Sequence, residues 1–240
     1  MRTRCFGWLI LLVSWSLAAG AEESVLTGRV DLVVRDGKAW HGGQGDTAVW
    51  LIPLAPSQLS PTGDPKPLPR LVQKNKSFQP RVVILRAGTA VEFPNHDPFF
   101  HNVFSLFDGK RFDLGLYEAG GTRFVHFDKA GISYIFCNIH PEMSAVVVAV
   151  ATPYYALTDR AGNVFIRGIS PGRYMLHVWN ERSLPATADS VTRELTIAEG
   201  GASFGTITLP ISAAPEAPHK NKYGRDYDPS APSNPIYEQP

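Results

Sequence analysis

The sequence predicts an all-β protein, and three features of its 240 residues indicate this class. The 20 prolines and 21 glycines are spread along the chain, so that they leave little room for long helices. Between them lie short runs rich in β-branched and aromatic residues, several of which alternate polar and apolar residues as strands do. These runs recur at short intervals, which is typical of β-sandwiches and barrels.

The N-terminal 21 residues have the features of a secretory signal peptide. A basic start with Arg2 and Arg4 precedes an apolar run over residues 6–18 and small residues at positions 19–21. This pattern predicts export and cleavage after Ala21. The apolar run is too short for a membrane anchor. We therefore expect a protein of the periplasm, or a secreted one, with no membrane span after cleavage.

Cleavage would change both the charge and the cysteine count. Loss of Arg2 and Arg4 from a chain with 23 basic and 22 acidic residues leaves a small acidic excess. A nearly balanced charge argues against nucleic acid or anionic membranes as partners. Cys5 would leave with the signal, so that Cys137 is the only thiol of the mature chain. An unpaired cysteine in an exported protein indicates a role other than a disulfide.

The strand-like runs before residue 150 follow one another closely. Residues 25–34 and 47–54 come first and precede a proline-rich stretch at residues 55–70, which we expect to be an exposed linker. Further strands are expected at residues 81–85, 90–93, 102–106, 123–127 and 133–137. The run over residues 145–150 is apolar throughout, as expected of a strand buried on both faces.

Turn and strand patterns continue after Pro153. Strands are expected within residues 158–166, 169–179, 191–197 and 202–209. From Ile211 onward Pro, Ala, Ser and charged residues dominate. Because such a composition buries too little apolar surface to fold, we expect residues 211–240 to form a disordered tail.

Three candidate metal ligands follow one predicted strand. His140 lies three residues after Cys137, and Met143 lies three residues after His140. Because Cys137 ends a strand, the loop after it can turn all three side chains toward one point. A thiolate and a thioether are soft ligands and imidazole suits copper, whereas calcium and magnesium prefer oxygen ligands. The set therefore predicts a copper site.

The best candidate for a second histidine ligand is His101, which lies among phenylalanines that would keep water from the metal. Two histidines, one cysteine and a weak axial methionine are the ligands of a blue, or type 1, copper centre. For His96 we favour a loop position over ligation. The alternatives are that Cys137 and Met143 are core residues, or that the site takes zinc, for which a thioether is a poor ligand.

The sequence around these residues resembles the cupredoxin family. Asn95, the run His101-Asn102-Val103 and the pair Ala130-Gly131 are similar to cupredoxin motifs. The Cys-x2-His-x2-Met spacing, with Pro141 after the histidine, resembles amicyanin most closely. The wider sequence is similar to plastocyanin-like proteins of the methylamine-utilisation type, over residues 70–150.

This resemblance implies a Greek-key cupredoxin sandwich at residues 68–149 with one type 1 copper per chain. The implied ligands are His101 through Nδ1, Cys137, His140 and Met143, with Asn95, Asn102 and Pro141 around them. Asn102 would hydrogen-bond the Cys137 loop, and an exposed edge of His140 would pass the electron. The chain departs from amicyanin by extra segments on both sides, which leaves the redox partner open.

A second resemblance concerns the flanking segments. Residues 158–176 are similar to the later strands of the transthyretin-type, regulatory-like sandwich found beside carboxypeptidases. Residues 28–30 and 49–51 fit the earlier strands of such a domain. We therefore expect residues 22–60 to pair with residues 150–210 in a second small β-sandwich. The alternative is that residues 22–60 add strands to the cupredoxin unit.

The leading functional prediction is a periplasmic electron carrier that is not an enzyme. Its donor and acceptor would be redox proteins, such as a periplasmic dehydrogenase or a c-type cytochrome. The alternative is copper binding for storage, delivery or sensing without electron transfer. A nucleophilic Cys137 with His140 as base is disfavoured because no carboxylate stands out to orient the base. A multicopper oxidase would need further histidine clusters, and a dinuclear purple-copper centre a second cysteine.

Overall fold

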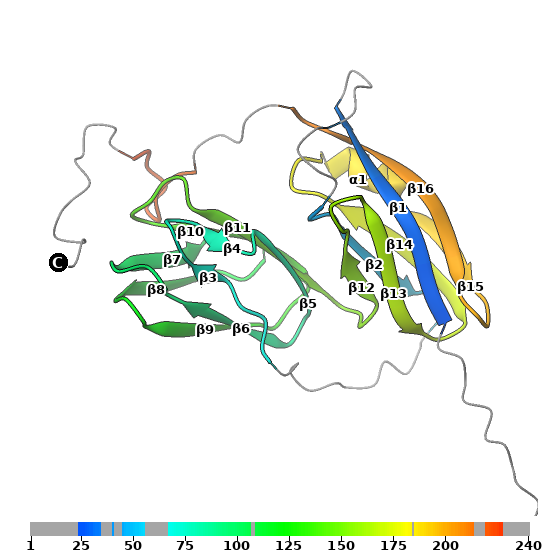
Figure 1. The fold of residues 1–240 in the computed structure, drawn as a ribbon, viewed down its shortest axis with the longest axis horizontal. Helices are drawn as coiled ribbons and strands as arrows, with labels where there is room; N and C mark the ends of the chain where they lie inside the picture. The colour runs from blue at the N-terminus through cyan, green and yellow to red at the C-terminus, as the bar shows by residue number, and fades with distance from the viewer. Residues whose placement is uncertain are drawn as a thin grey trace, which may run out of the picture.

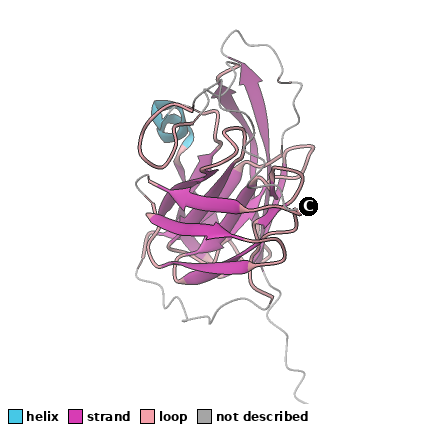
Figure 2. Ribbon diagram, turned by 90° about the vertical axis from the view of Figure 1, so that its left-hand side faces the viewer, coloured by secondary structure: helices cyan, strands magenta, loops and turns pink. Residues whose placement is uncertain are grey.

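The computed structural model describes residues 24–34, 40, 45–55, 67–106, 109–183, 185–213 and 219–227. In these residues the chain is almost entirely β-structure with one short helix, which confirms the predicted fold class (Figures 1 and 2). The predicted signal peptide, residues 56–66 of the predicted linker, and residues 214–218 and 228–240 of the predicted tail lie outside the described residues. No helix in the described part is long and apolar enough to cross a membrane.

The first of two β-sandwiches, here the split sandwich, combines strands from both ends of the chain. Its three-stranded sheet has the order β13 (Asn163–Ile169), β1 (Ser24–Val34) and β16 (Ala202–Ile211). Its four-stranded sheet has the order β12 (Tyr155–Leu157), β2 (Ala48–Pro53), β14 (Gly172–Trp179) and β15 (Arg193–Ile197). β1 thus lies antiparallel to β13 and parallel to β16, and β2 lies between β12 and β14.

The core of the split sandwich lies between its two sheets. Alternation along β1 places Leu26, Val30 and Leu32 in this core. Gly28 lies directly beneath the ring of Phe204, where an added Cβ would come within 2.4 Å of ring atoms. The helix α1 (Pro185–Val191) connects β14 to β15, so that the strand expected from residue 191 begins only at Arg193.

The second unit, here the site sandwich, is formed by the middle of the chain. Its five-stranded sheet has the order β5 (Val82–Arg86), β11 (Ser144–Val150), β10 (Gly131–Cys137), β7 (His101–Ser105) and β8 (Phe112–Tyr117). Two strand pairs complete it: β6 (Thr89–Pro94) with β9 (Thr122–Phe127), and β3 (Val72–Gln73) with β4 (Phe78–Gln79). One core contains apolar residues from β4 to β11, among them the fully buried Phe93, Tyr117 and Ile135, together with Leu71, which directly precedes β3.

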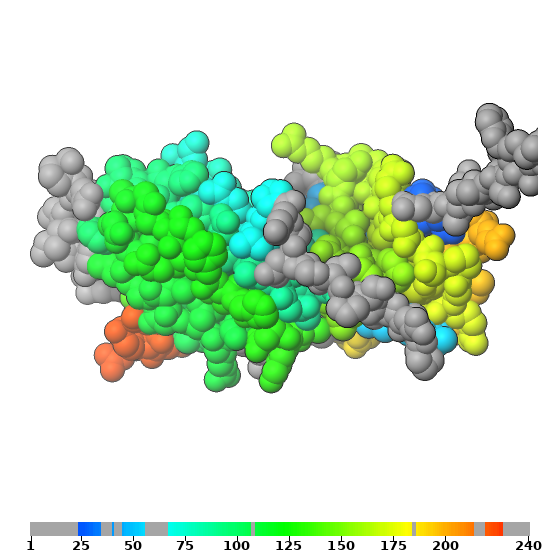
Figure 3. All heavy atoms as spheres, turned by 90° about the horizontal axis from the view of Figure 1, so that it is seen from below, coloured from blue at the N-terminus to red at the C-terminus, as the bar shows by residue number. Residues whose placement is uncertain are grey.

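The apolar strand β11 connects the two sandwiches, which lie side by side (Figures 1 and 3). Its residues 145, 147 and 149 belong to the core of the site sandwich. Its residues 146, 148 and 150 belong to a separate cluster with Ala48 and Trp179 of the split sandwich. The prediction that residues 145–150 form a strand buried on both faces is confirmed.

The prediction of a disordered tail from residue 211 is wrong for the part that the structure describes. β16 continues to Ile211, and residues 219–227, here the C-terminal strap, lie against the site sandwich (the orange-red segment in Figures 1 and 3). Composition alone missed this because the strap is held by aromatic stacking and hydrogen bonds. The ring of His219 stacks on that of Phe136 with 4.2 Å between centroids.

Candidate metal centre

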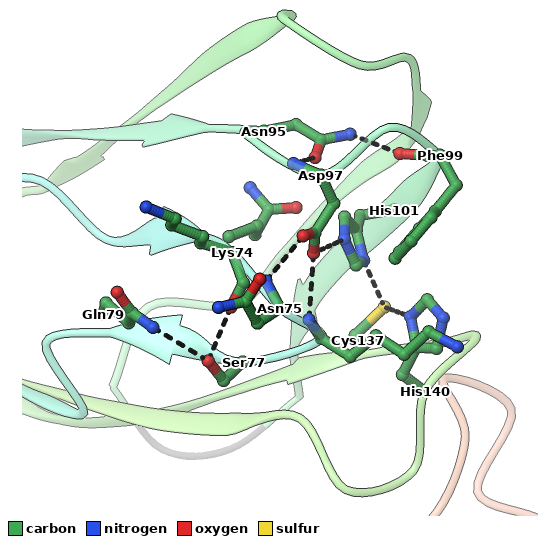
Figure 4. A network of polar contacts seen from close by, with 12 residues as sticks. Lys74, Asn75, Ser77, Gln79, Asn95, Asp97, Phe99, His101, Cys137 and His140 are labelled. Carbon is green, nitrogen blue, oxygen red and sulfur yellow. Dashed lines mark hydrogen bonds and ion pairs between the residues drawn. The ribbon is translucent and has the colours of Figure 1, made fainter. Parts of the chain in front are cut away.

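Three of the predicted ligands meet at one end of the site sandwich (Figure 4). The Sγ atom of Cys137 lies 3.5 Å from Nδ1 of His101 and 3.6 Å from Nδ1 of His140. The donor atoms of the three residues all lie within 4.8 Å of one another. No other group of three His, Cys, Asp or Glu donors with this proximity occurs in the described ranges. Two nitrogens thus face one sulfur.

Strand register explains how residues far apart in the sequence meet here. β7 and β10 are antiparallel neighbours in which Cys137 lies opposite Val103. His101 is two residues from Val103, so its side chain emerges on the same face of the sheet. Both His101 and Cys137 are fully buried. The sheet therefore supplies two of the donors, and the loop after β10 brings His140 to them.

The loop after Cys137 is closed by its own main chain. The amide of Met143 donates to the carbonyl of His140 at 3.0 Å, and the amide of Cys137 donates to the carbonyl of Met143 at 3.2 Å. The Met143 side chain is fully buried in the same apolar core as Cys137. Ligation by Met143 stays a prediction.

Asp97 orients the imidazole of His101. Its Oδ2 lies 2.9 Å from Nε2 of His101, and its carboxylate also accepts the amides of Asn75 at 2.6 Å and Lys76 at 3.0 Å (Figure 4). Burial raises the pKa of Asp97, but the hydrogen bonds from His101 and from these two amides outweigh burial, so that the pKa lies below its usual value. Nε2 of His101 therefore carries the proton, and the lone pair of Nδ1 faces the sulfur.

Asn95 and Asn102 hold the surrounding segments in place. The side chain of Asn95 donates to the carbonyl of Phe99 at 2.7 Å and accepts the amide of Asp97 at 3.0 Å. The main-chain carbonyl of Asn102 accepts the amide of Asn138 at 2.9 Å. Asn102 thus bonds the Cys137 loop through its main chain.

The side chain of Asn102 points to a different partner. It donates to Oδ1 of Asp113 at 2.6 Å and to the carbonyl of Gly115 at 2.9 Å. It therefore ties β7 to β8 rather than to the ligand loop, and only the strand register reveals that orientation.

The environment of the site keeps the two histidines neutral when no metal is bound. Burial, followed by the proximity of His101, lowers the pKa of His140 to about 4, and burial also lowers the pKa of His101 below its usual value. Burial raises the pKa of the Cys137 thiol, although amides of Ile139, Asn102 and His140 oppose it. A soft metal binds neutral imidazoles and a thiolate, so the two histidines are already in the ligating state, and metal binding would release the proton of the Cys137 thiol.

The remaining predicted residues lie at the edge of the site. His140 is half-buried, and the ring of Phe99 packs against it with 5.5 Å between centroids. Pro141 is half-buried beside it. His96 is exposed and does not belong to the donor group.

Sequence reasoning missed Asp97 and the C-terminal strap. Asp97 lies four residues before His101, and a carboxylate at that distance from a proposed ligand could have been tested as its hydrogen-bond partner. The strap left no comparable signal, because its contacts to Asp113, Phe136 and residues 137–138 depend on the folded sheet.

Comparisons with known proteins give matches only among solved structures. No family model matches the chain, and no curated protein matches it. The purple cupredoxin from Nitrosopumilus maritimus aligns at 20% identity over 34% of this chain and 99% of its own, with a TM-score of 0.31. Amicyanin from Paracoccus versutus aligns at 21% identity over 36% of this chain and 84% of its own, with a TM-score of 0.31.

A third similar structure is the copper-containing nitrite reductase from Thermus scotoductus. It aligns at 26% identity over 41% of this chain, with a TM-score of 0.34, and the match spans 27% of the reductase. At TM-scores of this size the likeness by itself identifies neither a family nor a function.

Proposed function

We propose that the chain is a type 1 copper protein of the periplasm that carries single electrons between redox proteins. The observation that carries this proposal is the position of one buried cysteine sulfur between the Nδ1 atoms of two neutral histidines. Hard cations would require oxygen donors, and a cysteine with imidazoles suits copper. Zinc would also accept this set, but the buried Met143 sulfur in the same loop favours copper.

When bound, copper would supply a one-electron couple between Cu(II) and Cu(I). His101, Cys137 and His140 would hold it, with Met143 as a fourth and weaker ligand. Asp97 keeps Nδ1 of His101 directed at the sulfur. Because His101 and Cys137 lie on neighbouring strands of one sheet, their positions are set before the metal binds. A site that is rigid in this way changes little between oxidation states, which favours rapid electron transfer.

Electrons would enter and leave through His140. Its half-buried ring lies beside Pro141 at the end of the sandwich, whereas His101 and Cys137 are enclosed. Its partners would be redox proteins, such as a periplasmic dehydrogenase or a c-type cytochrome. No enzymatic role is proposed, because four protein ligands would leave no position for a substrate.

Visible spectroscopy tests this function. Residues 22–240 are produced, loaded with Cu(II), and compared with Cys137→Ser and with His96→Gln as a control outside the donor group. We expect the wild type and His96→Gln to show an intense thiolate-to-copper band that bleaches with ascorbate and returns with ferricyanide. We expect no such band from Cys137→Ser.

Two results would contradict the electron-carrier proposal. One is a colourless wild type at full copper occupancy. The other is a protein that binds Cu(I) and exchanges it readily but does not reoxidise reversibly, since this is the behaviour of a storage or delivery protein.

A further inference from the structure

The C-terminal strap contacts the main chain of the proposed copper site itself. The hydroxyl of Tyr227 donates to the carbonyl of Cys137 at 2.9 Å. The amide of Lys222 donates to Oδ1 of Asn138 at 2.9 Å. The strap therefore binds both residues at the point where β10 passes into the ligand loop.

A closed ring of hydrogen bonds connects the strap to the strands around the site. Nζ of Lys222 lies 2.8 Å from Oδ2 of Asp113, whose Oδ1 accepts the side chain of Asn102 at 2.6 Å. The carbonyl of Asn102 accepts the amide of Asn138, and Asn138 returns to Lys222. Movement of any one member would break a bond to the next. The strap thus shares partners with the segments that hold Cys137.

Hydrogen bonds within the strap and ring contacts of His219 hold the strap in this position. Oδ1 of Asn221 accepts the amides of Tyr223 at 3.0 Å and Arg225 at 3.1 Å, and the amide of Asn221 donates to the carbonyl of Arg225 at 2.8 Å. These bonds fold residues 221–225 into a compact turn. Before this turn in the sequence, the ring of His219 stacks on that of Phe136. After the turn, the ring of Tyr227 meets the His219 ring edge-on, with 5.4 Å between centroids.

We propose that the C-terminal strap is a positioning element of the copper site, and that the Tyr227 hydroxyl holds the Cys137 main chain. This inference rests on the proposed copper function. A hydroxyl hydrogen directed at the Cys137 carbonyl puts a partial positive charge beside the residue that would hold copper, which would favour the less charged reduced state. Loss of the hydroxyl is therefore expected to lower the reduction potential and to loosen the start of the ligand loop.

The test compares Tyr227→Phe with Tyr223→Phe, a matched variant of the strap's other tyrosine, whose side chain is exposed. We expect Tyr227→Phe to keep the blue band and to shift the equilibrium between the oxidised and reduced forms about threefold toward the oxidised form. For one electron this is about 30 mV, since tenfold corresponds to about 59 mV. Tyr223→Phe is expected to leave the potential unchanged.

A second measurement needs no metal. The reaction rate of the Cys137 thiol with Ellman's reagent in metal-free protein reports how often the loop opens. We expect Tyr227→Phe to react several-fold faster than the wild type, and a chain ending at residue 218 to react faster still. Lys222→Ala is expected to accelerate the reaction, and Lys222→Arg, which keeps the charge that pairs with Asp113, to restore most of the wild-type rate.

The outcomes separate this inference from the proposed function. If Tyr227→Phe equals Tyr223→Phe in both potential and thiol reactivity, the strap does not position the site. If the wild type shows no blue band, the copper function fails, while the thiol rates of the metal-free proteins still decide whether the strap restrains Cys137.

Discussion

Replacement of Asp97 by asparagine tests how the chain orients His101. The carboxylate accepts three hydrogen bonds, from Nε2–H of His101 and from the amides of Asn75 and Lys76, and it is 4% exposed. An asparagine keeps the shape, but its NH2 group cannot accept. Whichever way the asparagine amide is turned, its NH2 group then faces at least one of these three buried N–H donors. The perturbation is thus confined to hydrogen bonding and charge.

The expected size of the effect follows from these bonds. A buried hydrogen bond to a charged group contributes about 1.5–3 kcal/mol, and here one or two are lost. We expect Asp97→Asn to lower the free energy of unfolding of the metal-free protein by about 2–4 kcal/mol. Because a ligating histidine loses its fixed orientation, copper affinity is expected to fall about 10- to 100-fold.

Two assays measure these effects. Urea denaturation gives the free energy of unfolding, and competition with a chelator of known affinity gives the copper affinity. Asp128→Asn serves as the control, since Asp128 is exposed, pairs with Lys110 and does not belong to the donor group. If Asp97→Asn binds copper as tightly as Asp128→Asn does, the orientation of His101 does not depend on Asp97, and the role given to Asp97 is wrong.

Three further predictions concern the axial ligand, the interface between the sandwiches and the pH dependence. Met143→Leu should keep the blue band and raise the potential, by about 60 mV if the oxidised state is disfavoured tenfold, and an unchanged potential in a titration would argue against axial ligation. Val148 is 1% exposed between the two sandwiches, so Val148→Asp buries a charge there and should lower the free energy of unfolding by more than about 3 kcal/mol in a urea titration. The control Phe165→Asp, at a 57% exposed position, should lower it by about 1 kcal/mol or less. The two site histidines, His101 and His140, have pKa values below 6.5 in the folded metal-free protein, about 4 for His140, so the unfolded chain binds more protons between pH 6.5 and 4. The free energy of unfolding should therefore fall by about 1 kcal/mol as the pH is lowered from 6.5 to 4. If the wild type shows no such fall relative to a variant with both histidines replaced by glutamine, the assigned neutral state is wrong.

The parts of the fold and site that the sequence predicted are those in which local chemistry determines structure. The alternating and apolar runs predicted most of the longer strands, including β11 with both faces buried. The spacing of Cys137, His140 and Met143 identified the ligand loop. His101 was found from its motif, and the structure places its Nδ1 at the Cys137 sulfur.

The parts that were missed depend on contacts between distant segments. The two-residue strands β3 and β4 are too short to show a period, yet the turn between them supplies the amides of Asn75 and Lys76 to Asp97. The C-terminal strap is polar in composition, and its position depends on the folded surface near Phe136. The side chain of Asn102 turns to Asp113 because β8 lies beside β7, which only the sheet order reveals.

X-ray absorption at the copper edge tests the central claim most directly. The copper-loaded chain of residues 22–240 should show one short sulfur ligand and two imidazole ligands, and the sulfur contribution should be absent from Cys137→Ser. A wild-type spectrum with nitrogen and oxygen ligands alone would contradict the proposed site at His101, Cys137 and His140.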